Sequence, residues 1–224
     1  MTTSPEITEP DTTDHVQEDT MSTTVTQHAA PARSDVTATA RPTRPFVTHG
    51  RMLSAGAAAW ALTIFAFSPN PHETVPLALY GIGSGAFQIG VLALLRVLYR
   101  TNALGEGRLA RFVLRMEAVF LSLAICSTFV DAIQVSDLTQ PGWLLLDAFW
   151  PISMLGMFLI GVRIAIAGRW NGVTRFYPMV AESWAVVTVP TMGIFGMGAA
   201  TVVGGLHLLL GYTVLGVLVS RKEA

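Results

Sequence analysis

Residues 75–98 read VPLALYGIGSGAFQIGVLALLRVL, and this stretch carries a single charged residue, Arg96. A helix that crosses a membrane needs about 20 mainly apolar residues, so the stretch is long enough to span the hydrocarbon core. Five further windows are also mainly apolar and long enough to span a membrane, and they cover residues 51–68, 112–134, 143–167, 177–195 and 198–220. The sequence therefore predicts an all-α polytopic membrane protein with six transmembrane helices.

The composition excludes an ordinary soluble domain. Hydrophobic residues make up 51% of the 224-residue chain and charged residues only 13%, about half the charged share of a typical soluble protein. We therefore expect the lipid bilayer to be the main partner of the chain. The formal net charge is −1, so no global basic field favours nucleic acid, and we expect no nucleic-acid partner.

The charges of the connecting segments predict the orientation in the membrane. Arginine or lysine precedes the first window and follows the second, fourth and sixth, whereas residues 69–74, residues 135–142 and the turn at 196–198 contain neither. By the positive-inside rule, this alternation predicts six crossings with both termini in the cytoplasm. Glu182 and Pro190 interrupt the window 177–195. A five-helix alternative would require residues 177–195 to be re-entrant or to lie on the membrane surface.

The polar N-terminus, residues 1–45, is expected to form an arm separate from the six-helix bundle of residues 46–224. It is rich in Thr, Ser, Pro and acidic residues and shows no helical or strand period, so it cannot bury enough apolar area to order itself. We expect a disordered cytoplasmic arm. It is interpreted either as a solvated extension with a juxtamembrane basic anchor or as a docking segment for a partner.

The basic residues also indicate the source of the chain. Thirteen of them are arginine and one, Lys222, is lysine, which is typical of a GC-rich genome, and we expect a bacterial source. A bacterial multi-pass protein of this kind is expected in the plasma (inner) membrane.

Polar side chains within the apolar windows are the candidate functional residues, because an ionisable group at the centre of a membrane helix costs about 2.5–3.5 kcal/mol. In the third window Glu117, Leu121, Ala124, Thr128 and Asp131 are spaced as one stripe of a helix. Small residues flank polar groups in the second and sixth windows in the same way. We therefore predict a polar site inside the bundle, and its members are Gln88, Glu117, Asp131, Asp147 and His207.

A second group of charged residues is expected near the cytoplasmic side of the membrane. Arg96, Arg115 and Arg163 are predicted to lie at a depth similar to that of Glu117 and Glu182. One interpretation is a structural layer of ion pairs with arginines that extend toward the headgroups. The other is a gate or a site for an anionic substrate.

Known catalytic and cofactor motifs are missing. The predicted layout resembles that of intramembrane serine proteases of the rhomboid type, which place a serine on the fourth helix and a histidine on the sixth. Ser153 and His207 occupy those helices, but Pro151 stands where the Gly-x-Ser motif requires glycine. No metal or cofactor is expected, because Cys126 is the single cysteine and no ligand spacing is present.

Two functions are consistent with these patterns. The first is binding or passage of a small solute or ion through a polar cavity in the bundle, with self-association into a homo-oligomer left open. The second is a non-catalytic membrane scaffold or sensor whose N-terminal arm binds a cytoplasmic partner. The absence of catalytic motifs favours both over an enzyme.

Overall fold

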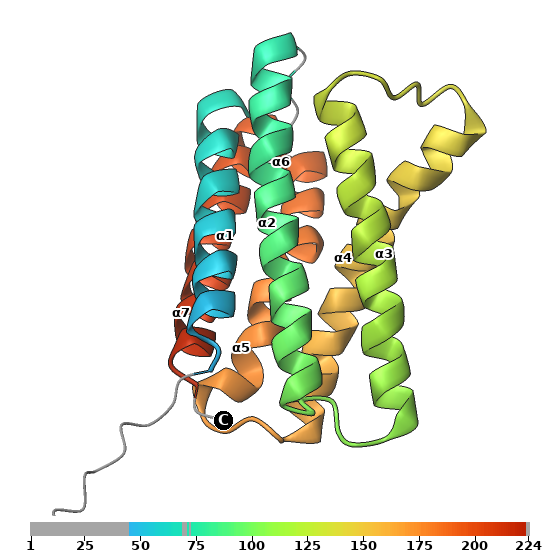
Figure 1. Cartoon of the computed structure of the whole chain (residues 1–224). Coiled ribbons are helices and arrows are strands. Elements are labelled where there is room, and N and C mark those ends of the chain that lie inside the picture. The colour runs from blue at the N-terminus through green and yellow to red at the C-terminus, as the bar shows by residue number, and fades with distance from the viewer. Residues whose placement is uncertain (1–44, 69–70, 72, 223–224) are drawn as a thin grey trace, which may run out of the picture. The chain divides into compact units, whose positions relative to one another are not determined.

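The computed structural model describes residues 45–68, 71 and 73–222. Apart from Pro45, the predicted N-terminal arm lies outside these residues, so its disorder and its partner stay predictions. The described part of the chain is all-helical and contains no strand (Figure 1). In chain order the elements are α1 (Val47–Phe67), α2 (Thr74–Arg100), α3 (Arg108–Ala132), α4 (Pro141–Ala167), α5 (Val173–Glu182), α6 (Trp184–His207), the π-helix η1 (Leu208–Thr213) and α7 (Val214–Ser220).

Five helical stretches are long and apolar enough to cross a membrane. Four of them are α1 to α4, and they match the first four predicted windows to within about four residues at each end. The fifth is the run Val173–Ser220, which has 48 residues and covers the last two predicted windows. The all-helical class is confirmed, whereas the predicted count of six crossings is not.

The last stretch folds back on itself. A straight helix of 48 residues would be about 72 Å long, more than twice the thickness of a hydrocarbon core of about 30 Å. Gly196 interrupts it with φ 83° and ψ 178°, a conformation essentially open only to glycine. The indole nitrogen of Trp184 donates to the carbonyl oxygen of Gly204 at 2.9 Å. Residues 173–195 and 197–220 therefore form two limbs that lie side by side.

Helix α2 lies between α1 and α3, and small residues permit the close approach (Figure 1). A Cβ added at Gly56 would meet the backbone of Ala86, and one added at Gly81 would collide with the side chain of Ala132. Close backbone contact at small residues is a common way to pack membrane helices. Helix α1 also packs against η1 and α7, and α4 packs between α3 and α5.

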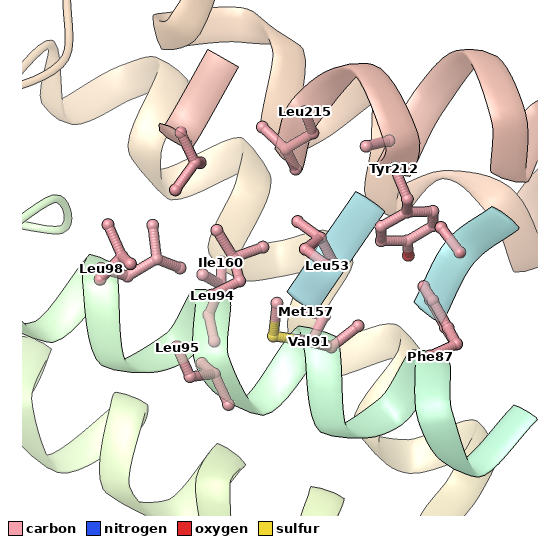
Figure 2. Packing of buried hydrophobic residues seen from close by; sticks show 14 of the residues in the cluster. Leu53, Phe87, Val91, Leu94, Leu95, Leu98, Met157, Ile160, Tyr212 and Leu215 are labelled. Carbon is pink, nitrogen blue, oxygen red and sulfur yellow. The ribbon is translucent and has the colours of Figure 1, made fainter. Parts of the chain in front are cut away.

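Aromatic side chains hold the centre of the bundle together. The Trp60 ring of α1 stacks on Phe87 of α2 with ring centroids 4.9 Å apart, and it lies 4.9 Å from Trp184 of α6. Phe87 in turn meets the edge of Tyr212 at 4.7 Å. Figure 2 shows Tyr212 and Phe87 in this cluster, together with the leucines that continue it along α2. Both limbs of the last stretch are thus fixed against α1 and α2.

The outer surface of the bundle is apolar. Leu62 on α1, Ile82 on α2 and Ile194 on α6 are 66%, 58% and 73% exposed. Large exposed apolar areas are rare on soluble monomers and mark contact with another apolar phase. The surface fits contact with lipid, and the five long helices fit a multi-pass membrane protein.

Candidate functional site

Three polar side chains predicted from the sequence are deeply buried inside the bundle. Glu117 on α3 is 4% exposed, and Gln88 on α2 and Glu182 on α5 are each 2% exposed. Burying a polar group is costly unless it finds a hydrogen-bond partner, and burying a charge costs more. The partners of these three residues therefore define what the site can do.

Glu117 is bonded to α4. The Ser153 hydroxyl donates to Glu117 Oε1 at 2.5 Å. Glu117 Oε2 faces Gly156, where an added Cβ would collide with that oxygen and lie 3.0 Å from Cδ. A hydroxyl and a glycine one turn apart on α4 thus make the space into which the carboxyl group fits.

Glu182 is the last residue of α5, and its partner comes from the π-helix. The Tyr212 hydroxyl donates to Glu182 Oε2 at 2.7 Å, whereas Glu182 Oε1 is buried and finds no hydrogen-bond partner in the described part of the chain. The wide turn of η1 spans Leu208 to Thr213, and the Thr213 hydroxyl reaches back to the Leu208 carbonyl at 3.4 Å. Short π-helical segments are often found at functional sites.

His207 helps to position the end of α5 and does not contact a carboxyl group. Its Nε2 lies 3.0 Å from the Val180 carbonyl oxygen and 3.1 Å from that of Ala181. Two carbonyl oxygens can only accept, so this nitrogen carries the hydrogen. His207 therefore binds the backbone one and two residues before Glu182, where the break between α5 and α6 frees carbonyl groups.

Gln88 connects α2 to α3. Its Nε2 donates to the Thr128 hydroxyl at 2.7 Å and to the Ser84 hydroxyl at 3.3 Å. Its Oε1 is buried and has no partner among the described residues. Gln88 and Glu182 thus each retain one unused acceptor in the interior.

These groups surround one small enclosed cavity. Gln88, Ser153, Glu182 and Tyr212 line it together with apolar side chains, and its volume is about 10 Å³. That volume is close to the least that holds one water molecule. Gln88 and Glu182 therefore line a space that admits no more than water or a small ion.

A larger groove also reaches Glu117. It lies between α3 and α4, has a volume of about 620 Å³, and is lined by Glu106, Glu117, Gly156 and Arg163. Because Glu117 lines this groove and is also bonded to Ser153 of the enclosed cavity, its carboxyl group lies between the two spaces.

The two other predicted carboxylates lie apart from this cavity. Asp131 on α3 and Asp147 on α4 are half-buried, and neither lines the enclosed cavity. Both lie near the segment that joins α3 to α4, which also carries Asp137. Hydrogen bonds from the Thr139 hydroxyl, the Thr139 backbone and Gln140 hold the pKa of Asp137 below its ordinary value. That end of the bundle is therefore acidic.

The three predicted arginines point outward. Arg96, Arg115 and Arg163 are exposed, and the ion pair found among the described residues joins Arg169 to Glu106 at 3.1 Å instead. The arginines thus lie at the helix ends without contacting Glu117 or Glu182. The structure brings Glu117 to a serine and Glu182 to a tyrosine.

All described cations gather at one end of the bundle, because the helices that carry them alternate in direction (Figure 1). They are Arg51, Arg96, Arg100, Arg108, Arg111, Arg115, Arg163, Arg169, Arg175, Arg221 and Lys222. We call this the basic end, and the groove beside Glu117 opens toward it. Lys222 lies 4.9 Å from the centre of the Trp170 ring, and burial lowers the pKa of its amine.

The structure bears on two of the chemistries that the sequence raised, a serine–histidine pair and a metal cluster. Ser153 is bonded to Glu117 and His207 to backbone carbonyls, so the serine–histidine pair of a rhomboid-type protease is not formed. Within residues 45–68 and 73–222 no cluster of three His, Cys, Asp or Glu side chains could hold a metal ion.

Sequence reasoning missed Tyr212 and the bonding role of Ser153. A signal for Ser153 was present, since Ser153 and Gly156 are one turn apart and form a small, polar face on α4. Such a face is the natural neighbour of a buried carboxyl group on the next helix. Tyr212 gave no comparable signal, because its direction depends on the π-helix.

Comparison with known proteins does not name a relative. No family model, no curated protein and no solved structure matches this chain. Its function must therefore be argued from the site alone.

Proposed function

We propose that this protein binds a small cation, including the proton, at Glu117 and Glu182 and passes it through the bundle. The carrying observation is that the Glu117 carboxyl group lies between an open groove and an enclosed cavity to which Gln88, Ser153 and Glu182 bring polar groups among apolar side chains. A carboxylate enclosed without a cation is costly, so each of these groups must hold a proton or capture a cation. Buried carboxyl groups in membrane helices are frequent parts of proton and ion pathways.

The polar groups form a ladder along the bundle. It begins at the groove near the basic end with Glu117, passes Ser153 to the cavity that Glu182 lines, and continues through Gln88 to Thr128. Asp131 follows Thr128 by one turn of α3 toward the acidic end. Together these residues supply exchangeable hydrogens or oxygen ligands at successive depths.

The size of the cavity restricts the ligand. A cavity of about 10 Å³ holds about one water molecule. A proton moving through water or hydroxyl groups needs no more room than this, whereas a sugar or an amino acid would require the bundle to open. We therefore favour a proton or a small monovalent cation as the ligand.

The proposed route also requires a topology. We propose that both limbs of the run Val173–Ser220 cross the bilayer, which makes six crossings. A limb of about 24 residues is about 36 Å long, enough for one crossing. With the basic end in the cytoplasm, the groove beside Glu117 opens toward the cytoplasmic side of a bacterial inner membrane.

Proton entry into proteoliposomes tests the function. The purified full chain is reconstituted into liposomes loaded with a pH-sensitive dye, and an inward proton gradient is imposed with valinomycin and K⁺ present. We expect Glu117→Gln and Glu182→Gln to reduce entry to the rate of protein-free liposomes, because glutamine keeps the shape but holds no exchangeable acid proton. Na⁺ and K⁺ flux are measured in separate liposomes that contain no valinomycin.

Asp137→Asn is the matched control, because Asp137 is exposed and lies in the segment between α3 and α4. It should leave the flux unchanged. The proposal would be refuted if the wild type and both glutamine variants gave the same proton flux, the same Na⁺ flux and the same K⁺ flux.

A further inference from the structure

A second groove, distinct from the one beside Glu117, lies over the outward face of α2 between α1 and α3. Its volume is about 500 Å³. Helix α2 forms its floor, because α1 and α3 both pack on α2 and not closely on each other. The lining residues Ile89, Leu92, Arg96 and Tyr99 recur at helical spacing along that floor.

The two ends of this groove differ in chemistry. Arg96, Arg115, Tyr99 and His49 lie toward the basic end, and the remaining lining residues are apolar. The guanidinium group of Arg115 donates to the Tyr99 hydroxyl at 2.9 Å and lies 5.7 Å from the centre of the Tyr99 ring. This contact holds Arg115 over the groove.

The charge of these arginines is not neutralised by the described part of the protein. Among the described residues no carboxylate lines the groove, and the one ion pair between them joins Arg169 to Glu106, which lie outside it. His49 Nδ1 is also buried, and no described residue forms a hydrogen bond with it. Guanidinium groups bind phosphate oxygens with two parallel hydrogen bonds, so two arginines that form no ion pair with the described residues favour a phosphate ligand in this groove.

The apolar part of the groove determines what must carry the phosphate. From Tyr99 to Ile89 the floor extends by about 15 Å along α2, which is about half the thickness of the hydrocarbon core. Half that thickness is the depth reached by the acyl chain of a lipid in one leaflet. A ligand that fills the groove therefore has an anionic phosphate head and a long apolar tail.

We propose that this groove is a binding site for an anionic phospholipid. The phosphodiester lies between Arg96 and Arg115, and an acyl chain lies along Ile89, Leu92 and Ala118. Basic pockets between membrane helices are known to bind such headgroups. The site is separate from Glu117, so it does not depend on the proposed cation pathway.

Lipid retention measured by native mass spectrometry tests this proposal. The full chain is equilibrated in mixed micelles with phosphatidylglycerol and phosphatidylcholine of identical acyl chains. Each cation near the headgroup favours the anionic lipid about fivefold, so we expect the wild type to prefer phosphatidylglycerol by about thirtyfold. The double variant Arg96→Gln with Arg115→Gln should lose nearly all of this preference.

The double variant Arg108→Gln with Arg111→Gln is the matched control. Both residues are exposed on α3 at the basic end, and neither lines the groove. It removes the same charge and should keep the preference. Equal loss in both double variants would show a diffuse electrostatic effect and would overturn the site.

A third variant separates lipid from free phosphate. Ala118→Phe fills the apolar part of the groove and keeps both arginines, so it should reduce lipid retention, and glycerol 3-phosphate should not displace the lipid. Retention unchanged by Ala118→Phe in a monodisperse preparation, or displacement by glycerol 3-phosphate, would contradict lipid binding. The arginine variants change exposed side chains, so their result does not depend on the folding of Ala118→Phe.

Discussion

The two oxygens of the Glu117 carboxyl group meet different surroundings. Oε1 accepts from Ser153 beside the enclosed cavity, and Oε2 faces Gly156 beside the open groove. A single side chain thus touches both spaces. Changes at Ser153 and Gly156 are therefore the most sensitive local tests.

We expect Ser153→Ala to destabilise the protein and slow proton entry. The variant removes the hydroxyl that donates to a buried carboxyl group, and an unsatisfied buried polar group costs about 1–3 kcal/mol. The free energy of unfolding in mixed micelles and the liposome flux both measure the effect. Ser122→Ala is the control, because Ser122 is exposed on α3 and donates to the Ala118 carbonyl. Indistinguishable results for the two variants would mean that the Ser153 bond is unimportant.

Gly156→Ala should displace the Glu117 carboxyl group. The new methyl group would occupy the position of Oε2, and overpacking of this kind costs about 1–3 kcal/mol. We expect lower stability together with lower flux. Gly142→Ala lies on the same helix with no atom within 4 Å of the added Cβ, and it should leave both measurements unchanged. An unaffected Gly156→Ala variant would contradict the placement of Glu117.

The sequence predicts which polar residues are buried better than it predicts their partners. Gln88, Glu117 and Glu182 stand out because polar groups are rare in apolar helices. Their partners depend on how each helix is rotated about its axis, which the spacing within one helix does not determine. The predicted layer of ion pairs shows this, because Arg96, Arg115 and Arg163 are exposed whereas Glu117 is bonded to Ser153.

At the scale of elements, the turn at Gly196 decides how the last stretch packs. We expect Gly196→Ala to lower the free energy of unfolding by about 1–3 kcal/mol, because φ 83° with ψ 178° is strained for any residue with a Cβ. Gly198→Ala is the control, since its added Cβ meets no atom within 4 Å. A Gly196→Ala variant as stable as the control would argue against the turn.

Helix windows were predictable because each apolar run is long and is bounded by polar residues. The π-helix was not. In an α-helix, residues five apart point about 140° away from each other, so His207 and Tyr212 are not expected to face one neighbour. The wider turn of η1 lets His207 bind the Val180 carbonyl while Tyr212 binds Glu182. Such a local widening depends on tertiary contacts with α5.

At the scale of the whole bundle, the positions of the charges and of the apolar surface both fit a bundle that crosses a membrane. Every described cation lies at the basic end, and the side of the bundle is covered by exposed apolar residues such as Leu62 and Ile194. Lipid around the sides and water at both ends satisfy this distribution. The depth of Glu117, and with it the proposed pathway, depends on this arrangement.

The central claim is therefore a membrane-crossing bundle with one basic end, and it predicts which residues share a side of the bilayer. Single cysteines at Gly107, Asn171, Lys222, Ser136 and Gly198, in a Cys126→Ser background, report the side through a membrane-impermeant thiol reagent. The background is needed because Cys126 is the one cysteine of the chain.

Labelling these cysteines in intact cells and in inverted vesicles is the most direct measurement. With both limbs of the last stretch crossing, positions 107, 171 and 222 should react only from the cytoplasmic side, and positions 136 and 198 only from the opposite side. Labelling of positions 171 and 222 from opposite sides would show a single crossing by the run Val173–Ser220 and contradict the account.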